Sequence, residues 1–292
     1  MIVNHALRPG VRSFSSEVAR HSGDETRVFK TVGGAPLLLS LHYPADYDPA
    51  RQYPLFVFVH GGGWQGRKVF GDQAEWSGDY LGYLARYYAE RGWLCAGIDY
   101  RMMRKKGQIA GYEMMDLFED CMDALEYLKD HAGELGADLT RAVVLGESAG
   151  GHLAGMLATQ TDFFTTAVLV NPVTDLSDPK WNGYLPKQPA HPALRGVSAA
   201  EIEKLFSPVC HVRSDLCPIL LLHGAADSVV NPQHARAFHD RMLECGNEAE
   251  LHLIEDTNHA FLLVEYMQEL GNAPDAAGIA VDLIDEWLAK HI

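Results

Sequence analysis

The sequence has no long hydrophobic run and no surplus of positive charge. None of its 292 residues lies in a stretch approaching the roughly 18 consecutive apolar residues that a membrane-spanning helix needs. The formal net charge is −15, from 24 Lys and Arg against 39 Asp and Glu. A field of that sign repels nucleic acid and anionic membrane surfaces, so neither is an expected partner.

Cysteine is scarce, with five residues that are not clustered. An odd, scattered set does not indicate a disulfide framework. Cys95 and Cys121 fall in strand-like and helical patterns, where we expect buried free thiols, whereas a bridge between Cys210 and Cys217 stays open. The start "MIVNHALRPG" lacks the basic-then-apolar pattern of a secretion signal. We therefore expect a cytoplasmic protein, with a trimmed signal as the alternative.

Motifs for bound cofactors are also missing. The chain has no HExxH or CxxC spacing and no glycine fingerprint for a dinucleotide or a phosphate. We therefore predict neither a catalytic metal nor another cofactor. Internal repeats and low-complexity tracts are absent too, and no sequence feature marks an oligomer interface.

Short continuous apolar runs alternate with longer helical patterns along most of the chain. Such runs are typical of strands that helices cover on both faces. Strands are expected at 27–32, 37–44, 53–60, 92–100, 142–146, 166–172, 218–224 and 249–256. Helices are expected at 76–92, 112–133, 148–160, 231–246 and 274–292. The alternation predicts an α/β fold, with a mostly parallel, doubly wound sheet that starts with an antiparallel hairpin around the turn "GGAP".

One interval interrupts this alternation. Residues 173–213 lie between two expected strands but are too long and too rich in proline for a simple crossover helix. Loops of that length in compact domains are usually functional covers. We therefore expect a single domain over residues 1–292 with a lid inserted at about 173–213.

Four expected strands end in residues that can carry chemistry. Ligands of open parallel sheets bind beyond the carboxyl ends of the strands, so these positions share one edge. They are the loop "HGGGW" (60–64), the turn "GESAG" (146–150), Asp227 and, within "TNHAF", His259. A Gly-x-Ser-x-Gly match alone is weak, but this one stands where an apolar strand turns into a helix.

The serine of that turn needs a base to become a nucleophile. His259 is the candidate base for Ser148, and Asp227 is the candidate carboxylate that orients His259. The chain order of serine, acid and histidine is that of the α/β-hydrolase fold. Asp175 is the alternative acid, although capping a turn is its other interpretation. His152 falls on the helix after Ser148, where we expect a packed side chain.

Taken together, "HGGGW", "GESAGGH", "HGAAD" and "TNHAF" resemble the hormone-sensitive-lipase-like and related microbial carboxylesterases of the α/β-hydrolase superfamily. The resemblance implies that the backbone N–H groups of Gly62, Gly63 and Ala149 hold an oxyanion. Fixed amide dipoles in a dry site stabilise such a charge strongly. We expect His60 to organise the loop.

The glycine loop before Trp64 also resembles that of smaller, capless carbohydrate and phenolic-acid esterases and of arylformamidases. This favours a serine esterase for short-chain carboxylic esters, with acetyl or feruloyl esters of carbohydrates as candidate small-molecule substrates. Trp64, Trp181 and Tyr184 either form an aromatic wall for the substrate or pack the lid onto the sheet. An arylformamidase-type amidase is the alternative function, and a non-catalytic binding protein of the same fold is a distant one.

Overall fold

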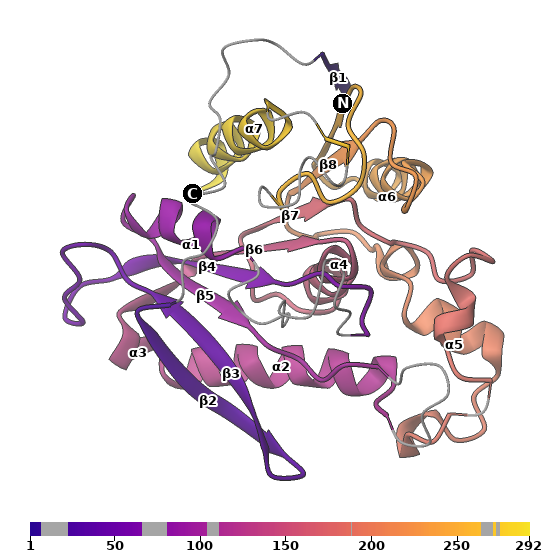
Figure 1. Cartoon of the computed structure of the whole chain (residues 1–292), viewed down its shortest axis with the longest axis horizontal. Helices are drawn as coiled ribbons and strands as arrows, with labels where there is room; N and C mark the ends of the chain where they lie inside the picture. Colours follow the sequence, from indigo (N-terminus) through magenta and orange to yellow (C-terminus); the bar gives the residue numbers. More distant parts are fainter. Residues whose placement is uncertain (7–22, 66–80, 104–110, 188, 264–270, 273–274) are drawn as a thin grey trace.

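Nine strands form one sheet in the described part of the chain (Figure 1). The computed structural model describes residues 1–6, 23–65, 81–103, 111–187, 189–263, 271–272 and 275–292. The strand order is β1-β9-β8-β7-β6-β4-β5-β3-β2. The strands are β1 (Ile2–His5), β2 (Glu25–Val32), β3 (Ala35–His42), β4 (Tyr53–Val59), β5 (Leu94–Ile98), β6 (Ala137–Glu147), β7 (Thr166–Val170), β8 (Ile219–Gly224) and β9 (Ala249–Ile254).

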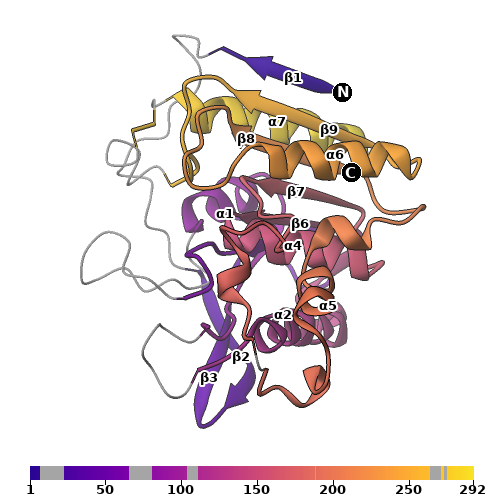
Figure 2. The same ribbon diagram turned by 90° about the vertical axis from the view of Figure 1, so that its right-hand side faces the viewer.

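Strand direction confirms the predicted fold class. The pairs from β5 through β4, β6, β7 and β8 to β9 are all parallel, whereas β2 pairs with β3, and β3 with β5, in antiparallel fashion. Strand β1 was not predicted from the sequence; it pairs in parallel with β9 at the outer edge of the sheet (Figure 2). Four residues with an alternating pattern are too short a signal to distinguish from a loop.

Helices cover both faces of the sheet. They are α1 (Gly82–Ala89), α2 (Met114–Asp130), α3 (Ala132–Leu135), α4 (Ala149–Gln160), α5 (Ala199–Leu205), α6 (Gln233–Glu244) and α7 (Asp275–His291). The start of the helix expected at 76–92 lies outside the described residues. The helix expected at 112–133 is interrupted at His131, whose backbone is not helical and which separates α2 from α3. None of the helices in the described ranges is long and apolar enough to cross a bilayer.

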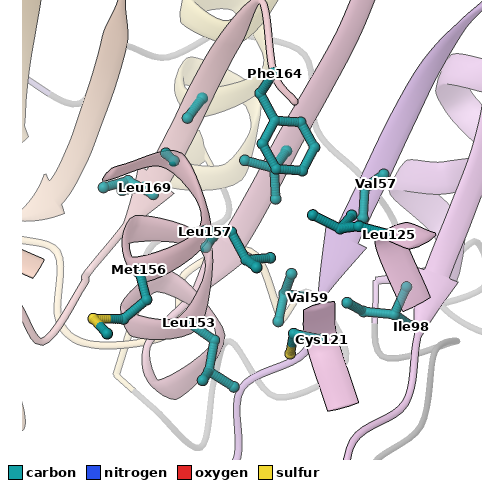
Figure 3. Close-up of a cluster of buried hydrophobic side chains, with 14 of the residues drawn as sticks. Val57, Val59, Ile98, Cys121, Leu125, Leu153, Met156, Leu157, Phe164 and Leu169 are labelled. Atoms are coloured by element: carbon teal, nitrogen blue, oxygen red, sulfur yellow. The ribbon is translucent and has the colours of Figure 1, made fainter. Parts of the chain in front are cut away.

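Alternate residues of the central strands supply two hydrophobic cores. Val57 and Val59 of β4 face α2, α4 and α6, whereas Phe56 and Phe58 face α1 and α7. Leu153 and Leu157 project from α4 into the first core, close to Val59 (Figure 3). A strand that buries both faces needs apolar residues at every position, which explains the continuous runs in the sequence.

The cysteines occupy the positions expected of free thiols. Cys95 on β5 and Cys121 on α2 are buried in the two cores. All five cysteines are free, so the bridge between Cys210 and Cys217 is not formed.

The insertion at 173–213 contains little regular structure besides α5. It includes three short 3-10 helices, η2 (Asn182–Tyr184), η3 (Pro192–Leu194) and η4 (Pro208–His211). Leu194, Ile202 and Phe206 are buried in the first core. The insertion is therefore packed against the same face of the sheet as α4.

Replacing Leu157 by alanine should lower the free energy of unfolding by about 2–5 kcal/mol, because the side chain is fully buried and its loss leaves a cavity. Leu243→Ala on α6 is the matched control, since that leucine is 46% exposed and its truncation should change stability by less than about 0.5 kcal/mol. Urea unfolding measures both. Equal losses in the two variants would contradict this packing.

Candidate active site

Ser148 stands on a strained turn between β6 and α4. Its φ of 58° and ψ of −119° lie in a region that a residue with a side chain rarely adopts. Two glycines make the turn possible. A Cβ at Gly146 would lie 2.1 Å from the carbonyl oxygen of Gly150, and a Cβ at Gly150 would lie 2.1 Å from that of Val59. The turn lifts Ser148 to the edge of the sheet, where its side chain is partly exposed.

Ser148, His259 and Asp227 form one chain of hydrogen bonds. His259 Nδ1 lies 2.7 Å from Asp227 Oδ2, and its Nε2 lies 2.8 Å from Ser148 Oγ. A carboxylate only accepts, so Nδ1 carries the proton and Nε2 accepts from the serine hydroxyl. The three residues come from the ends of three strands, and the structure brings them together as the sequence predicted.

The carboxylate of Asp227 stays ionised in this buried place. The backbone amides of Val229 and Val230 donate to Oδ1 at 2.8 and 2.9 Å. Burial alone would raise the pKa of Asp227, but hydrogen bonds and charge from His223 and His259 outweigh it and hold the pKa well below its usual value. The ionised form is the one that can accept from His259.

Asp175, the alternative acid, is engaged elsewhere. Its Oδ1 accepts from both the amide and the hydroxyl of Ser177, at 2.8 and 2.6 Å. This is the turn-capping arrangement that Asp adopts readily. The hydrogen bond to His259 is made by Asp227 instead.

The glycine loop after β4 lies beside the serine turn. Val59 and Gly146 are register partners in adjacent parallel strands, so both loops leave the sheet at the same point. Gly62 and Gly63 have φ values of 103° and 61°. Ala149, the first residue of α4, follows the serine directly. The backbone groups expected to hold an oxyanion thus come from two neighbouring strand ends.

The aromatic residues near this loop pack against one another. Trp64 is 0% exposed, and its indole N–H donates to His152 Nδ1 at 3.3 Å. The rings of Trp181 and Tyr184 lie edge-on to Trp64, with centroids 5.9 and 5.2 Å away. Trp64 therefore fills the packing role and presents no surface to a substrate, and Trp181 is buried as well. Tyr184 remains partly exposed.

Two further histidines support this region without facing Ser148. His152 lies within the helix and its Nε2 donates to the carbonyl of Phe206 at 2.7 Å, which ties α4 to the insertion. His60 stacks on Tyr100, whose hydroxyl donates to the His60 carbonyl at 2.6 Å. Both rings are buried, as expected for packed and loop-organising residues.

Sequence reasoning missed three residues that contact the triad or its loops. Glu147 is buried beside the serine and accepts from the amide of Leu262 at 3.3 Å. Asn272 donates to the carbonyl of His259 at 2.9 Å. His223, the last side chain of β8, lies 3.3 Å from Asp227 Oδ2. A polar residue within an otherwise apolar strand end was the available signal for Glu147 and His223.

One group in the described residues has the composition of a metal site. Ligand atoms of Asp116, Glu119 and His191 lie within 4.8 Å of one another. However, Asp116 already pairs with Arg101 at 2.8 Å, and His191 with Glu119 at 3.4 Å. A cation would have to displace the arginine, so the group is explained as an ion-pair network between α2 and the insertion.

Stability should fall between pH 6.5 and pH 4 because of His60 and His152. Burial lowers the pKa of each from 6.5 to about 4, so in this range the unfolded chain binds protons that the folded chain does not. Each ring should contribute up to about 1.4 kcal/mol per pH unit. Urea unfolding at several pH values in this range gives the slope of the free energy of unfolding against pH. That slope should be shallower for His152→Asn and for His60→Asn than for the wild type. An unchanged slope would mean that these rings titrate alike in both states.

Comparison with known proteins agrees with the fold. The family model BD-FAE matches residues 39–242. Ethyl acetate hydrolase of Pseudomonas putida is 26% identical over 280 residues, which are 90% of this chain and 81% of that protein. The probable carboxylic ester hydrolase LipM of Mycobacterium tuberculosis is 28% identical over 84% of this chain, and the match spans 57% of its length.

Solved structures give the same result. The apo form of Thermogutta terrifontis esterase 2 superposes with a TM-score of 0.73 at 29% identity, covering 92% of this chain and 94% of that one. Its butyrate-bound form is 31% identical with a TM-score of 0.71, over 92% and 94% of the two chains. The chain therefore belongs to the BD-FAE family of α/β-hydrolases, and the relatives described above are named as ester hydrolases or esterases.

Proposed function

We propose that this chain is a serine hydrolase that cleaves short-chain carboxylic esters through an acyl-enzyme. The observation that carries the proposal is the continuous hydrogen-bonded chain from Ser148 through His259 to Asp227. A serine with a base at 2.8 Å, itself oriented by a buried carboxylate, is the arrangement that nucleophilic catalysis requires.

The reaction has two halves. Ser148 Oγ attacks the ester carbonyl while His259 Nε2 takes its proton, and that proton passes to the leaving alcohol as the C–O bond breaks. Water then gives a proton to His259 and attacks the acyl group, and the serine oxygen recovers the proton as the carboxylic acid leaves. Asp227 stabilises the imidazolium formed in each half.

The oxyanion of each tetrahedral intermediate would be held by the amides of Gly62, Gly63 and Ala149. This part of the proposal is supported by the register of β4 and β6 and by the left-handed backbone of both glycines. Amides fixed before the reaction need no reorganisation as charge develops, which is why they stabilise it efficiently.

A short acyl group is the substrate class that the relatives favour. One is named as an ethyl acetate hydrolase, and esterase 2 was solved with butyrate and with propionate bound.

We also infer that residues 1–292 form one domain in which 173–213 is the cover of the site. The contact of Trp181 with Trp64 supports this, and of the three candidate aromatic residues only Tyr184 is exposed enough to meet a substrate.

Rates on nitrophenyl acetate, butyrate and octanoate test the class. We expect kcat/KM to be highest for acetate or butyrate, and Ser148→Ala to lower it at least about a thousandfold. Ser177→Ala is the matched control, because that serine is exposed on the insertion, and it should keep the wild-type rate. Acetylated sugars, feruloyl esters and N-formyl anilides in the same panel distinguish an esterase from an amidase. A Ser148→Ala variant that kept the full rate would falsify the mechanism.

Asp227→Asn should lower kcat by about 10³–10⁴-fold, because an amide in that place favours the wrong tautomer of His259. Asp175→Asn should change kcat no more than a few-fold, since its carboxylate caps a turn. Steady-state kinetics on nitrophenyl acetate compare the two variants. A larger loss from Asp175→Asn would reverse the assignment of the acid.

A further inference from the structure

His223 is a buried histidine with no role in the mechanism above. It is 0% exposed at the end of β8, four residues before Asp227. Its Nε2 lies 3.0 Å from the carbonyl oxygen of Val230 and 3.3 Å from Asp227 Oδ2. Both neighbours are acceptors, so Nε2 carries the proton and donates. Its Nδ1 has no hydrogen-bond partner in the described chain.

The two oxygens of Asp227 are held in different ways. Oδ1 accepts from the backbone amides of Val229 and Val230, which belong to the loop itself. Oδ2 accepts from His259 at 2.7 Å, and the Nε2 of His223, whose hydrogen bond goes to the carbonyl of Val230, lies 3.3 Å from the same oxygen. Both imidazoles thus bring an N–H close to Oδ2, and each reduces the strength with which that oxygen attracts the other.

We propose that His223 is a positioning residue, whose Nε2–H fixes the plane of the Asp227 carboxylate and moderates the pull of Oδ2 on His259. This inference rests on the proposed function, in which His259 is the base. Unlike the backbone donors to Oδ1, the donor from His223 is anchored in the sheet. It therefore ties the acid loop to β8, which lies beside β7 and β9 at the site.

Removing this donor has a predictable direction. Without the Nε2–H, the negative charge on Oδ2 is less stabilised and attracts the His259 Nδ1–H more strongly. The imidazolium form of His259 is then favoured over the neutral base. The acid limb of kcat/KM should therefore move to higher pH.

Other titratable groups nearby are engaged with partners of their own. His234 of α6 lies close enough to His223 to interact with it electrostatically, and burial lowers the pKa of His234 while Asp178 and Asp175 oppose that change. His234 pairs with Asp178 at 3.3 Å. On β6, Glu147 accepts from the amide of Leu262. These groups are unchanged in the variants below, so a shift between variants reports on His223.

Two amide variants separate the hydrogen bond from packing. His223→Gln reaches about as far as Nε2 and can still donate, whereas His223→Asn is too short to do so. We expect His223→Asn to move the midpoint of the acid limb of kcat/KM to higher pH by roughly half a pH unit or more, and to lower kcat. In His223→Gln the midpoint should stay near that of the wild type. A purely structural histidine would change stability in both variants and leave the limb in place.

Proton NMR supplies a readout that needs no turnover. The His259 Nδ1–H should give a low-field resonance that Asp227→Asn abolishes. This resonance should move to lower field in His223→Asn but not in His223→Gln. The inference would be overturned if the resonance had the same position in the wild type and in both His223 variants. It would also be overturned if the acid limb of kcat/KM shifted equally in His223→Asn and His223→Gln. Activity that survives Ser148→Ala would instead refute the proposed function, and the resonance would still test the contact between His223 and Asp227. His223→Leu serves as the second loss variant if the Asn form does not fold.

Discussion

The site depends on one steric constraint, the approach of Gly150 to the carbonyl of Val59. A Cβ at that glycine would lie 2.1 Å from the oxygen, so no other residue fits without moving the backbone. This contact brings the first turn of α4 onto the end of β4. It forces Ser148 into a conformation that would otherwise be unfavourable by about 1–3 kcal/mol. The packing of α4 against the sheet supplies the compensation.

The electrostatics of the site follow from where its carboxylate lies. Asp227 is buried, yet two amides and the imidazole of His259 donate to its oxygens, and the Nε2 of His223 lies 3.3 Å from one of them. A buried charge that accepts several hydrogen bonds stays ionised and fixed in direction. Asp227 in turn fixes the orientation of the His259 ring, so that Nε2 faces the partly exposed Ser148. The acid is thus buried while the nucleophile stays accessible.

Much of the fold was predictable because a central strand that is buried on both faces consists of a continuous run of apolar residues. The strand at β4 is an example, since alternate residues such as Phe56 and Val57 serve opposite cores. The edge strand β1 has no such run, because four residues at a sheet edge need not be apolar. Trp64 was ambiguous for a similar reason, since an indole suits a substrate wall and a packed core equally well. Only its burial and its bond to His152 decide between them.

The sequence by itself determined the fold class and the candidates for the serine, the base and the acid, because strand ends in a parallel sheet converge and the motifs follow those ends in order. The tertiary structure decided which acid faces His259, since Asp227 and Asp175 both follow strands and differ only in what surrounds them. It also decided the place of His223, whose distance from Asp227 depends on the path of the loop between them. Such contacts depend on the path of the backbone and on burial, and neither can be read from the spacing of residues in the sequence.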